Sequence, residues 1–185
     1  MKTLIQLGCN VGKDLVRDFL TENPFDYILL IDANPYCIEH VKDSYKGVDN
    51  VHYEVAAVAD IEKDAMFYIP HFDMFKTSAH SSLIKEHVLK HGHNESQMKA
   101  MAVKCKTFTQ IMEEHNLTSL TRLYIDCEGE DSNIIRSLEL KRFRIEFIMY
   151  EHGHASAEDQ KSCQDFLKAH GYTLEIVGGD TIATL

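Results

Sequence analysis

The sequence predicts a doubly wound α/β fold with three layers, built on a mostly parallel seven-stranded sheet that closes with an antiparallel C-terminal hairpin. Short apolar runs typical of buried strands alternate with segments of helical periodicity along most of the chain. The connections between these segments are short, as expected where sequential strands share one sheet. The last two apolar runs flank Gly178-Gly179-Asp180, a sequence typical of a tight turn between antiparallel strands.

The first third of the chain predicts a β-α-β-α-β unit. Buried strands are expected at residues 3–7, 27–31 and 51–58. The helix between the first two strands presents Leu15, Val16, Phe19 and Leu20 at helical spacing. The next helix begins at Asn34-Pro35, because proline suits the first helical turn. This order predicts parallel strands joined by right-handed crossovers.

The rest of the chain resumes the alternation after one irregular stretch. Residues 65–104 lack a clean period, and we expect residues 71–101 to form a mobile lid or insertion over the site, with Ser81 and Ser82 facing the acceptor. A variable surface insertion is the alternative. Further elements are predicted as a helix at 107–115, a strand at 123–125, a helix near 134–138, a strand at 147–150, a helix at 159–170 and hairpin strands at 172–177 and 181–185. The whole chain, 1–185, is therefore expected to be a single domain.

Composition excludes several classes of protein. Nineteen Lys and Arg residues against 29 Asp and Glu give a net charge of −10, which repels phosphate backbones, so we expect no nucleic-acid partner. No apolar run approaches the ~20 residues of a membrane span, and no export signal is evident, so no membrane partner and a cytoplasmic location are expected. The five cysteines include no C-x-x-C pair, which suggests neither a disulfide framework nor a zinc ribbon.

The turn after the first strand reads Gly8-Cys9-Asn10-Val11-Gly12. Gly8 and Gly12 permit a positive φ and a close approach of the backbone to a ligand, and Asn10 tolerates the left-handed region. The pyrophosphate-binding turn of dinucleotide enzymes has the spacing G-x-G-x-x-G, and the third glycine is missing here. The spacing therefore disfavours NAD, although a purely structural turn that supports helix packing remains an alternative.

Asp32 ends the second strand, 20 residues after Gly12. A carboxylate at this position can accept hydrogen bonds from both ribose hydroxyls of an adenosine. The alternative is that Asp32 caps the following helix, which Asn34 could do equally well.

Three segments carry a family resemblance that covers essentially the whole chain. They are Gly8-Cys9-Asn10-Val11-Gly12, Asp32-Ala33-Asn34-Pro35 and Tyr124-Ile125-Asp126-Cys127-Glu128-Gly129-Glu130, followed by Glu151 at the end of a late strand and Gly171-Tyr172 near the C-terminus. In order and spacing they resemble the FkbM family of methyltransferases. The resemblance implies a class I methyltransferase fold, in which the last strand of a seven-stranded sheet is antiparallel. It also implies transfer of a methyl group from S-adenosylmethionine to a hydroxyl of a small metabolite or saccharide.

The cofactor is expected to contact residues of these segments and of the third strand: Gly8, Asn10, Gly12, Asp32, Ala33, Asn34, Ala57 and Asp126. Two positions depart from the family pattern, since Gln6 replaces an acid before the glycine turn and Tyr124 replaces a lysine before Asp126. If the missing acid helps to hold the cationic methionine end, another acid such as Asp126 must serve. A catalytically silent adenosine-binding module is therefore an alternative function, and an NAD-dependent oxidoreductase is a less favoured one.

For catalysis, we expect Asp126, Glu128 and His152 to converge at the carboxyl edge of the sheet, because they follow adjacent strands. Asp126 would face the methionine amino group, and Glu128 and His152 would face the acceptor. His152 is the predicted general base, since its imidazole is largely neutral at pH 7. Glu151 could serve instead, or these side chains could hold a divalent cation.

His87 and His91 lie four residues apart, with His80 and His93 nearby, and two imidazoles on one helical face can bind zinc. However, 11 histidines produce such spacings by chance, and no cysteine or carboxylate in the same segment completes a ligand set. The sequence therefore predicts no metal site.

Overall fold

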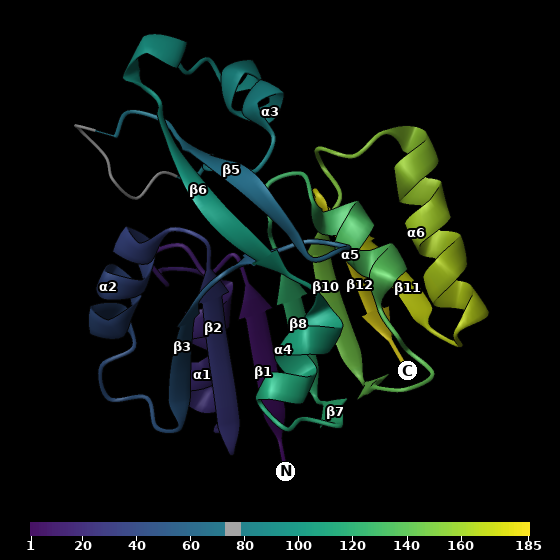
Figure 1. Ribbon diagram of the computed structural model, residues 1–185. Helices are drawn as coiled ribbons and strands as arrows, with labels where there is room; N and C mark the ends of the chain where they lie inside the picture. Colours follow the sequence, from purple (N-terminus) through teal and green to yellow (C-terminus); the bar gives the residue numbers. More distant parts are fainter. Residues whose placement is uncertain (73–78) are drawn as a thin grey trace.

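A seven-stranded sheet forms the centre of the computed structural model, which describes residues 1–72 and 79–185 (Figure 1). Its strand order is β11-β12-β10-β8-β1-β2-β3. Five strands, from β10 to β3, run parallel, and β12 runs antiparallel to both β10 and β11. The strands are β1 (Thr3–Leu7), β2 (Tyr27–Asp32), β3 (Val51–Val55), β8 (Arg122–Ile125), β10 (Phe147–Glu151), β11 (Thr173–Val177) and β12 (Asp180–Thr184). This confirms the predicted fold.

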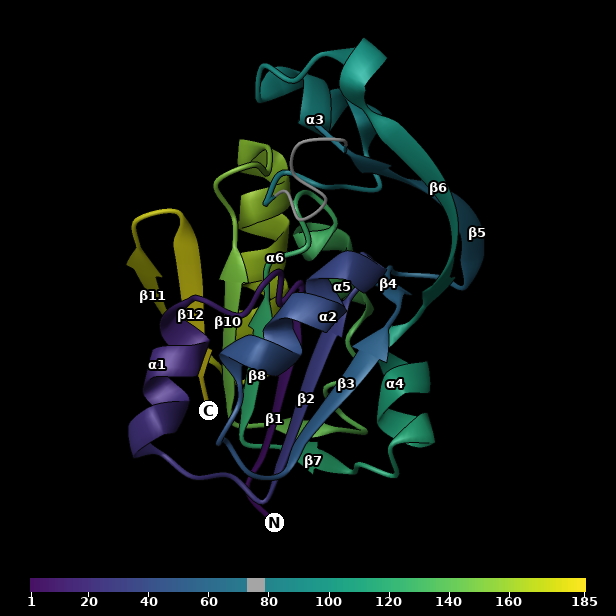
Figure 2. The same ribbon diagram turned by 90° about the vertical axis from the view of Figure 1, so that its left-hand side faces the viewer.

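Helices cover both faces of the sheet, as Figures 1 and 2 show from two sides. α1 (Leu15–Glu22) and α2 (Pro35–Ser44) pack on one face against a core that includes Leu4 and Leu30. The opposite core includes Ile5 and Leu7, which pack with the helices α4 (Phe108–Glu114), α5 (Asp131–Ser137) and α6 (Ala157–Ala169). Both faces of β1 are thus buried, which explains its continuous apolar run. Gln6 is the polar exception on its α1 face.

Polar side chains at the helix starts fix where these helices begin. The Asp14 carboxylate accepts hydrogen bonds from the N–H groups of Val16 and Arg17 at the start of α1. The Asn34 side chain accepts one from the Tyr36 N–H, and Pro35 opens α2 as predicted. Thr107 and Gln110 form a capping box on α4. Asp14 lies beside the turn that follows β1, and Asn34 lies beside the turn that follows β2. These caps therefore also shape the carboxyl edge of the sheet.

An insertion between β3 and α4 stands above that edge (Figures 1 and 2). It contains the strands β5 (Lys63–Ile69) and β6 (Lys99–Lys106), which pair antiparallel, and the short helices α3 (Lys85–Lys90) and η1 (Glu95–Gln97). The predicted strand 51–58 is split, because β4 (Ala57–Val58) leaves the main sheet and pairs with β6. Two further short strands, β7 (Ser119–Leu120) and β9 (Arg144–Ile145), form a separate pair.

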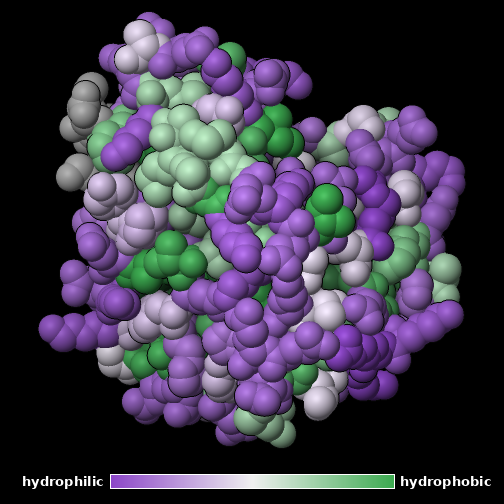
Figure 3. All heavy atoms as spheres, viewed as in Figure 1, coloured by the Kyte–Doolittle hydropathy of each residue, from purple (hydrophilic) through white to green (hydrophobic). Residues whose placement is uncertain are grey.

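The β5–β6 ribbon is a regular structure within residues 65–104, where the sequence shows no clean period. Along β6, Ala100, Ala102 and Lys104 are exposed, whereas Cys105 is buried and Met101 and Val103 are half-buried. This is the period of a strand. The alternation in hydropathy is concealed because the exposed face carries alanines and the half-buried face carries Met101 and Val103, which are also apolar. Figure 3 shows the result as a weakly hydrophobic area over the ribbon on an otherwise largely hydrophilic face. Residues 73–78 of the predicted lid lie outside the described residues.

No helix in the described part of the chain has both the length and the apolar composition that a bilayer span requires.

Replacing Gly12 by alanine should destabilise the fold by about 2–5 kcal/mol. Gly12 has a φ of +64°, and an added Cβ would lie 2.4 Å from Val41 Cγ2 and 2.7 Å from Tyr45 Cε2. Backbone strain of about 1–2 kcal/mol would therefore add to overpacking of about 1–3 kcal/mol. Gly47→Ala is the matched control, because Gly47 has a φ of +88° but no atom within 4 Å of the added Cβ. Urea unfolding measures both variants, and equal losses would contradict the packing role of Gly12.

Candidate active site

A cleft of about 640 Å³ lies at the carboxyl ends of β1, β2 and β8, beneath the insertion. We call it the first cleft. Its position is where open α/β sheets bind ligands. Seven of the residues predicted from the sequence line it: Gly8, Asn10, Asp32, Ala33, Ala57, Asp126 and Glu128. The insertion contributes Phe67, Ala79, Ser81 and Leu83 to its wall.

The turn after β1 is pressed against the end of β8. Gly8 has a φ of +76°, and an added Cβ would lie only 1.7 Å from the carbonyl oxygen of Asp126. Asn10 adopts the left-handed region with a φ of 44°, as its residue type allows. The Asn10 N–H donates a hydrogen bond of 2.8 Å to Asp32 Oδ2. The turn is therefore held by both neighbouring strands.

Asp32 presents its carboxylate to the first cleft from the end of β2. Oδ1 accepts the Asn34 N–H at 2.8 Å, and Oδ2 accepts the Asn10 N–H. The side chain is 9% exposed. The pKa of Asp32 is raised to about 6: burial is the main cause, the two N–H donors oppose it and nearby Asp126 adds to it. Each oxygen keeps a lone pair with which it can accept another hydrogen bond.

Gly12 and Asn34 do not line the first cleft. The missing Cβ of Gly12 faces Val41 and Tyr45, so glycine is needed here for the packing of α2. Asn34 is fully buried and caps α2, which is the role that the alternative interpretation gave to Asp32. Both residues support the site through the backbone.

A second cleft of about 650 Å³ lies between β1, β8, β10 and the start of α1. We call it the second cleft. Four carboxylates line it, and Asp126 lines both clefts and so connects them. No Lys, Arg or His is among its described lining residues. The four acids are Asp14, Asp126, Glu151 and Asp180.

Two acids of the second cleft, Asp126 and Glu151, hold their protons unusually strongly. The pKa of Asp126 is raised to about 6 and that of Glu151 to about 7, mainly by burial and in addition by the neighbouring carboxylates. This crowding of negative charge without a cation makes the second cleft a favourable place for a positively charged ligand.

Gln6 lines the second cleft from β1. Its Nε2 donates a hydrogen bond of 2.9 Å to Asp14 Oδ2. Its buried Oε1 has no hydrogen-bond partner among the described residues. An unpaired buried acceptor is costly unless a ligand supplies a donor. Gln6 therefore offers an acceptor to a bound ligand and is coupled to the carboxylate of Asp14.

Glu128 follows β8 and has a left-handed backbone with a φ of 50°. Its Oε2 lies 2.7 Å from His87 Nε2, on α3 of the insertion. Burial is the main cause that raises the pKa of Glu128 to about 8 and lowers the pKa of His87 to about 4. The hydrogen bond thus joins two groups whose charged forms are both disfavoured by burial.

His152 does not join Asp126 and Glu128 in either cleft. Its Nδ1 lies 3.0 Å from Thr181 Oγ1, so its side chain is directed at β12. His154, two residues further on, lies instead 3.9 Å from Glu128 and 3.4 Å from Glu151. The loop after β10 has no periodicity from which the sequence could distinguish the two histidines.

Ser82 is also placed differently from the prediction. Ser82 is 1% exposed. Its Oγ donates a hydrogen bond of 2.7 Å to the Glu128 carbonyl oxygen and accepts one of 2.9 Å from the Ile84 N–H. Ser82 therefore ties the insertion to the loop after β8, whereas Ser81 lines the first cleft.

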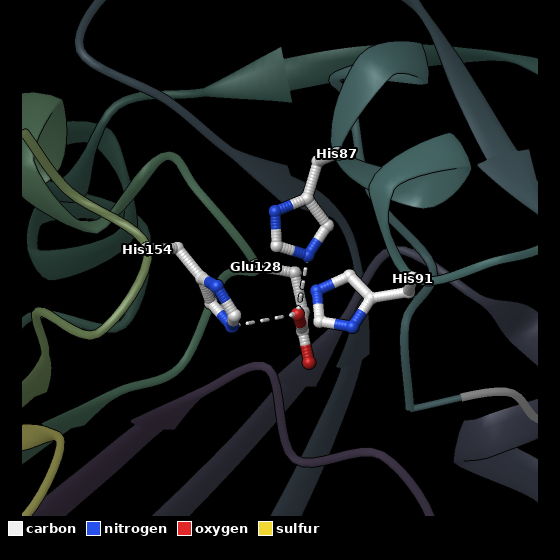
Figure 4. Close-up of side chains that lie close together, drawn as sticks. All are labelled: His87, His91, Glu128 and His154. Carbon is white, nitrogen blue, oxygen red and sulfur yellow. Dashed lines mark hydrogen bonds and ion pairs between the residues drawn. The ribbon is translucent and has the colours of Figure 1, made fainter.

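The sequence predicts no metal site, because 11 histidines produce such spacings by chance and no carboxylate in the segment of His87 and His91 completes a ligand set. The fold supplies one, because Glu128 and His154 arrive from other segments and lie with these two histidines. Figure 4 shows the three imidazoles gathered around the Glu128 carboxylate.

Comparison with solved structures places this architecture among methyltransferases. An FkbM methyltransferase from Methylobacillus flagellatus KT aligns with a TM-score of 0.60 at 11% identity, over 100% of this chain and 43% of that one. Precorrin-6y C5,15-methyltransferase from Geobacter metallireducens GS-15 aligns with a TM-score of 0.54 at 13% identity, over 100% and 80%. Fibrillarin from Aeropyrum pernix, solved with S-adenosyl-L-methionine natively bound, aligns with a TM-score of 0.53 at 10% identity, over 99% and 66%.

These similarities, at such low identity, concern the fold. The chain spans less than half the length of the FkbM structure that it matches. A search of curated proteins gave no match. At the level of sequence, residues 6–174 match the family model described as the methyltransferase FkbM domain. The chain therefore belongs to the FkbM family of S-adenosylmethionine-dependent methyltransferases and has the Rossmann-like class I fold.

Proposed function

We propose that this chain transfers a methyl group from S-adenosylmethionine to a hydroxyl of a small metabolite or saccharide, with adenosine in the first cleft and the methionine end in the second. The observation that carries the proposal is the connection of the two clefts at Asp126. The first cleft suits a neutral nucleoside and the second suits a cation. S-adenosylmethionine combines these two parts, a neutral adenosine and a positively charged methionine end.

The first cleft fits adenosine in both shape and chemistry. Asp32 has acceptor capacity for the two ribose hydroxyls, since each oxygen uses one lone pair on a backbone N–H. Ala57, Val58 and Phe67 supply apolar surface for a planar base. The close contact of Gly8 with Asp126 lets the backbone of the turn approach the ligand without an intervening side chain.

The second cleft fits the methionine end and resolves the departure at Gln6. The ammonium group can donate to the unpaired Gln6 Oε1 and face the carboxylates of Asp14 and Asp126. Asp14 thus supplies the negative charge that Gln6 lacks, through a side chain already bonded to it. This arrangement supports a binding-competent site over a degenerate one.

S-adenosylmethionine supplies a methyl group on a positively charged sulfur. In an in-line displacement, the bond between the methyl carbon and sulfur breaks while the bond from that carbon to the acceptor oxygen forms. The hydroxyl proton passes to a base, and S-adenosylhomocysteine leaves. Glu151 is the base that we propose, because it lines the second cleft beside Asp126, where His152 is absent. The acidic walls favour a neutral, hydroxyl-rich acceptor and disfavour nucleic acid.

Adenosine affinity should weaken as the pH falls below about 6. The ionised Asp32 carboxylate accepts both ribose hydroxyls, and protonation at its raised pKa of about 6 removes one acceptor. The loss should approach about tenfold per pH unit well below this pKa. Calorimetry with adenosine from pH 5 to pH 8 measures it, with Asp32→Asn expected to bind weakly and independently of pH. Asp126→Asn controls for the neighbouring carboxylate, and a flat wild-type profile would exclude Asp32 as the ribose acceptor.

Asp14→Asn should weaken S-adenosylmethionine binding by about 10–100-fold and leave adenosine binding unchanged. Asparagine caps a helix as well as aspartate does, so α1 should persist, while a charge-assisted interaction of about 1.5–3 kcal/mol is lost. Calorimetry with the two ligands separates the effects. Equal losses for both ligands would indicate a structural defect, and unchanged S-adenosylmethionine affinity would remove Asp14 from the site.

Glu151→Gln should lower methyl transfer by about 10²–10⁴-fold, the contribution of a positioned base; S-adenosylmethionine affinity is measured separately, because Glu151 also lines the second cleft. Formation of S-adenosylhomocysteine is measured with sugars and small alcohols as acceptors. His152→Ala is the control and should retain turnover, because His152 contacts Thr181. Cofactor binding with no turnover on any hydroxyl compound would favour the silent module instead.

A further inference from the structure

Four potential metal ligands from three separate segments meet beside the first cleft (Figure 4). His87 and His91 come from α3 and its C-terminal end, Glu128 from the loop after β8, and His154 from the loop after β10. One ligand atom from each lies within 4.8 Å of those of the other three. From this geometry we propose that the cluster binds one divalent transition-metal ion of the zinc type, which fastens the insertion to the main sheet.

The spacing of the four side chains is close to that of a bound ion. A tetrahedral ion with ligands at about 2.0–2.1 Å holds neighbouring ligand atoms about 3.3–3.4 Å apart. His87 Nε2 and Glu128 Oε2 are 2.7 Å apart, and His154 Nε2 and Glu128 Oε2 are 3.9 Å apart. Movements of at most about 1.5 Å therefore suffice. His91 is only partly buried and His154 is exposed, so their side chains have room for these movements.

The ligand types select the kind of metal. Three imidazoles and one carboxylate suit zinc and its neighbours in the first transition series, whereas magnesium and calcium prefer an all-oxygen set. Charge favours binding as well, because Glu151 lies 3.4 Å from the same His154 Nε2. Two carboxylates thus face the position where a divalent cation would sit.

The surroundings hold these ligands in place. The ring of His80 stacks on that of His91 with 4.3 Å between centroids and 17° between planes, which restricts the orientation of His91. The left-handed backbone of Glu128 is a strained conformation of a kind found at ligand clamps. Three imidazoles with ring centroids 4.6–5.0 Å apart gain no hydrogen bond to one another that would explain their convergence.

An ion here would connect α3 of the insertion to two loops at the carboxyl edge of the main sheet. Because the insertion forms part of the wall of the first cleft, the ion would fix that wall. Metal binding at this cluster does not depend on whether the chain transfers a methyl group to a hydroxyl.

The test uses the tag-free full chain, stripped of metal with a chelator and titrated calorimetrically with zinc. One ion per chain is expected, with a rise in Tm and no competition from magnesium. Cobalt in place of zinc should give the visible absorption of a low-coordinate site with nitrogen ligands. His91→Ala and His154→Ala should each weaken zinc binding by more than about 10-fold, since loss of even an outer partner costs 10–100-fold.

His40→Ala is the matched control, because His40 is an exposed histidine on α2, outside the cluster. It should bind zinc as the wild type does. Circular dichroism of the metal-free variants establishes that they fold, which is expected because His91 and His154 are partly exposed. Substoichiometric zinc, or the same affinity in wild type and in folded His91→Ala and His154→Ala, would reveal an adventitious ion only and overturn the proposal.

Discussion

The carboxylate of Asp32 organises the carboxyl edge of the sheet. Through Asn10 it fixes the turn after β1, and through Asn34 it fixes the residue that starts α2. A buried carboxylate must have its acceptor capacity satisfied. The two N–H groups use only half of it, and the remainder is directed at the first cleft. The carboxylate that holds the turn in place therefore also presents free acceptor capacity to the first cleft, where we propose that the paired ribose hydroxyls bind.

Negative charge is concentrated in the interior of the site and is not only a property of the surface. Burial raises the pKa values of five acids around the two clefts, and repulsion among them adds to the shift: Asp32, Asp126, Glu128, Asp131 and Glu151. Structures do not gather such groups without cost, because each is destabilised in its charged form. Cationic ligands offset that cost. A sulfonium with its ammonium group in the second cleft and a divalent metal beside Glu128 are both of the required charge.

Much of the fold could be predicted from the sequence because its signals are local. Strands buried on both faces give continuous apolar runs, and the turn residues before β12 mark the hairpin. Gly8 and Asp32 could be placed for the same reason, since a strand end fixes its position in a parallel sheet. The direction of a side chain depends on contacts distant in sequence. Gly12 meets Val41 and Tyr45, and His152 turns towards Thr181, and neither contact has a local signature.

Glu128 shows how far such non-local contacts reach into function. Its side chain contacts His87, its carbonyl oxygen accepts the Ser82 hydroxyl, and the residue also lines the first cleft. His87 and Ser82 both belong to the insertion. Glu128 therefore contacts the insertion and the first cleft at the same time. If a ligand in the first cleft and an ion at the histidine cluster each favour one arrangement of Glu128, each changes the affinity of the other by the same factor, because linkage between two sites is reciprocal. The loop after β8 is thus the element that contacts both the insertion and the first cleft.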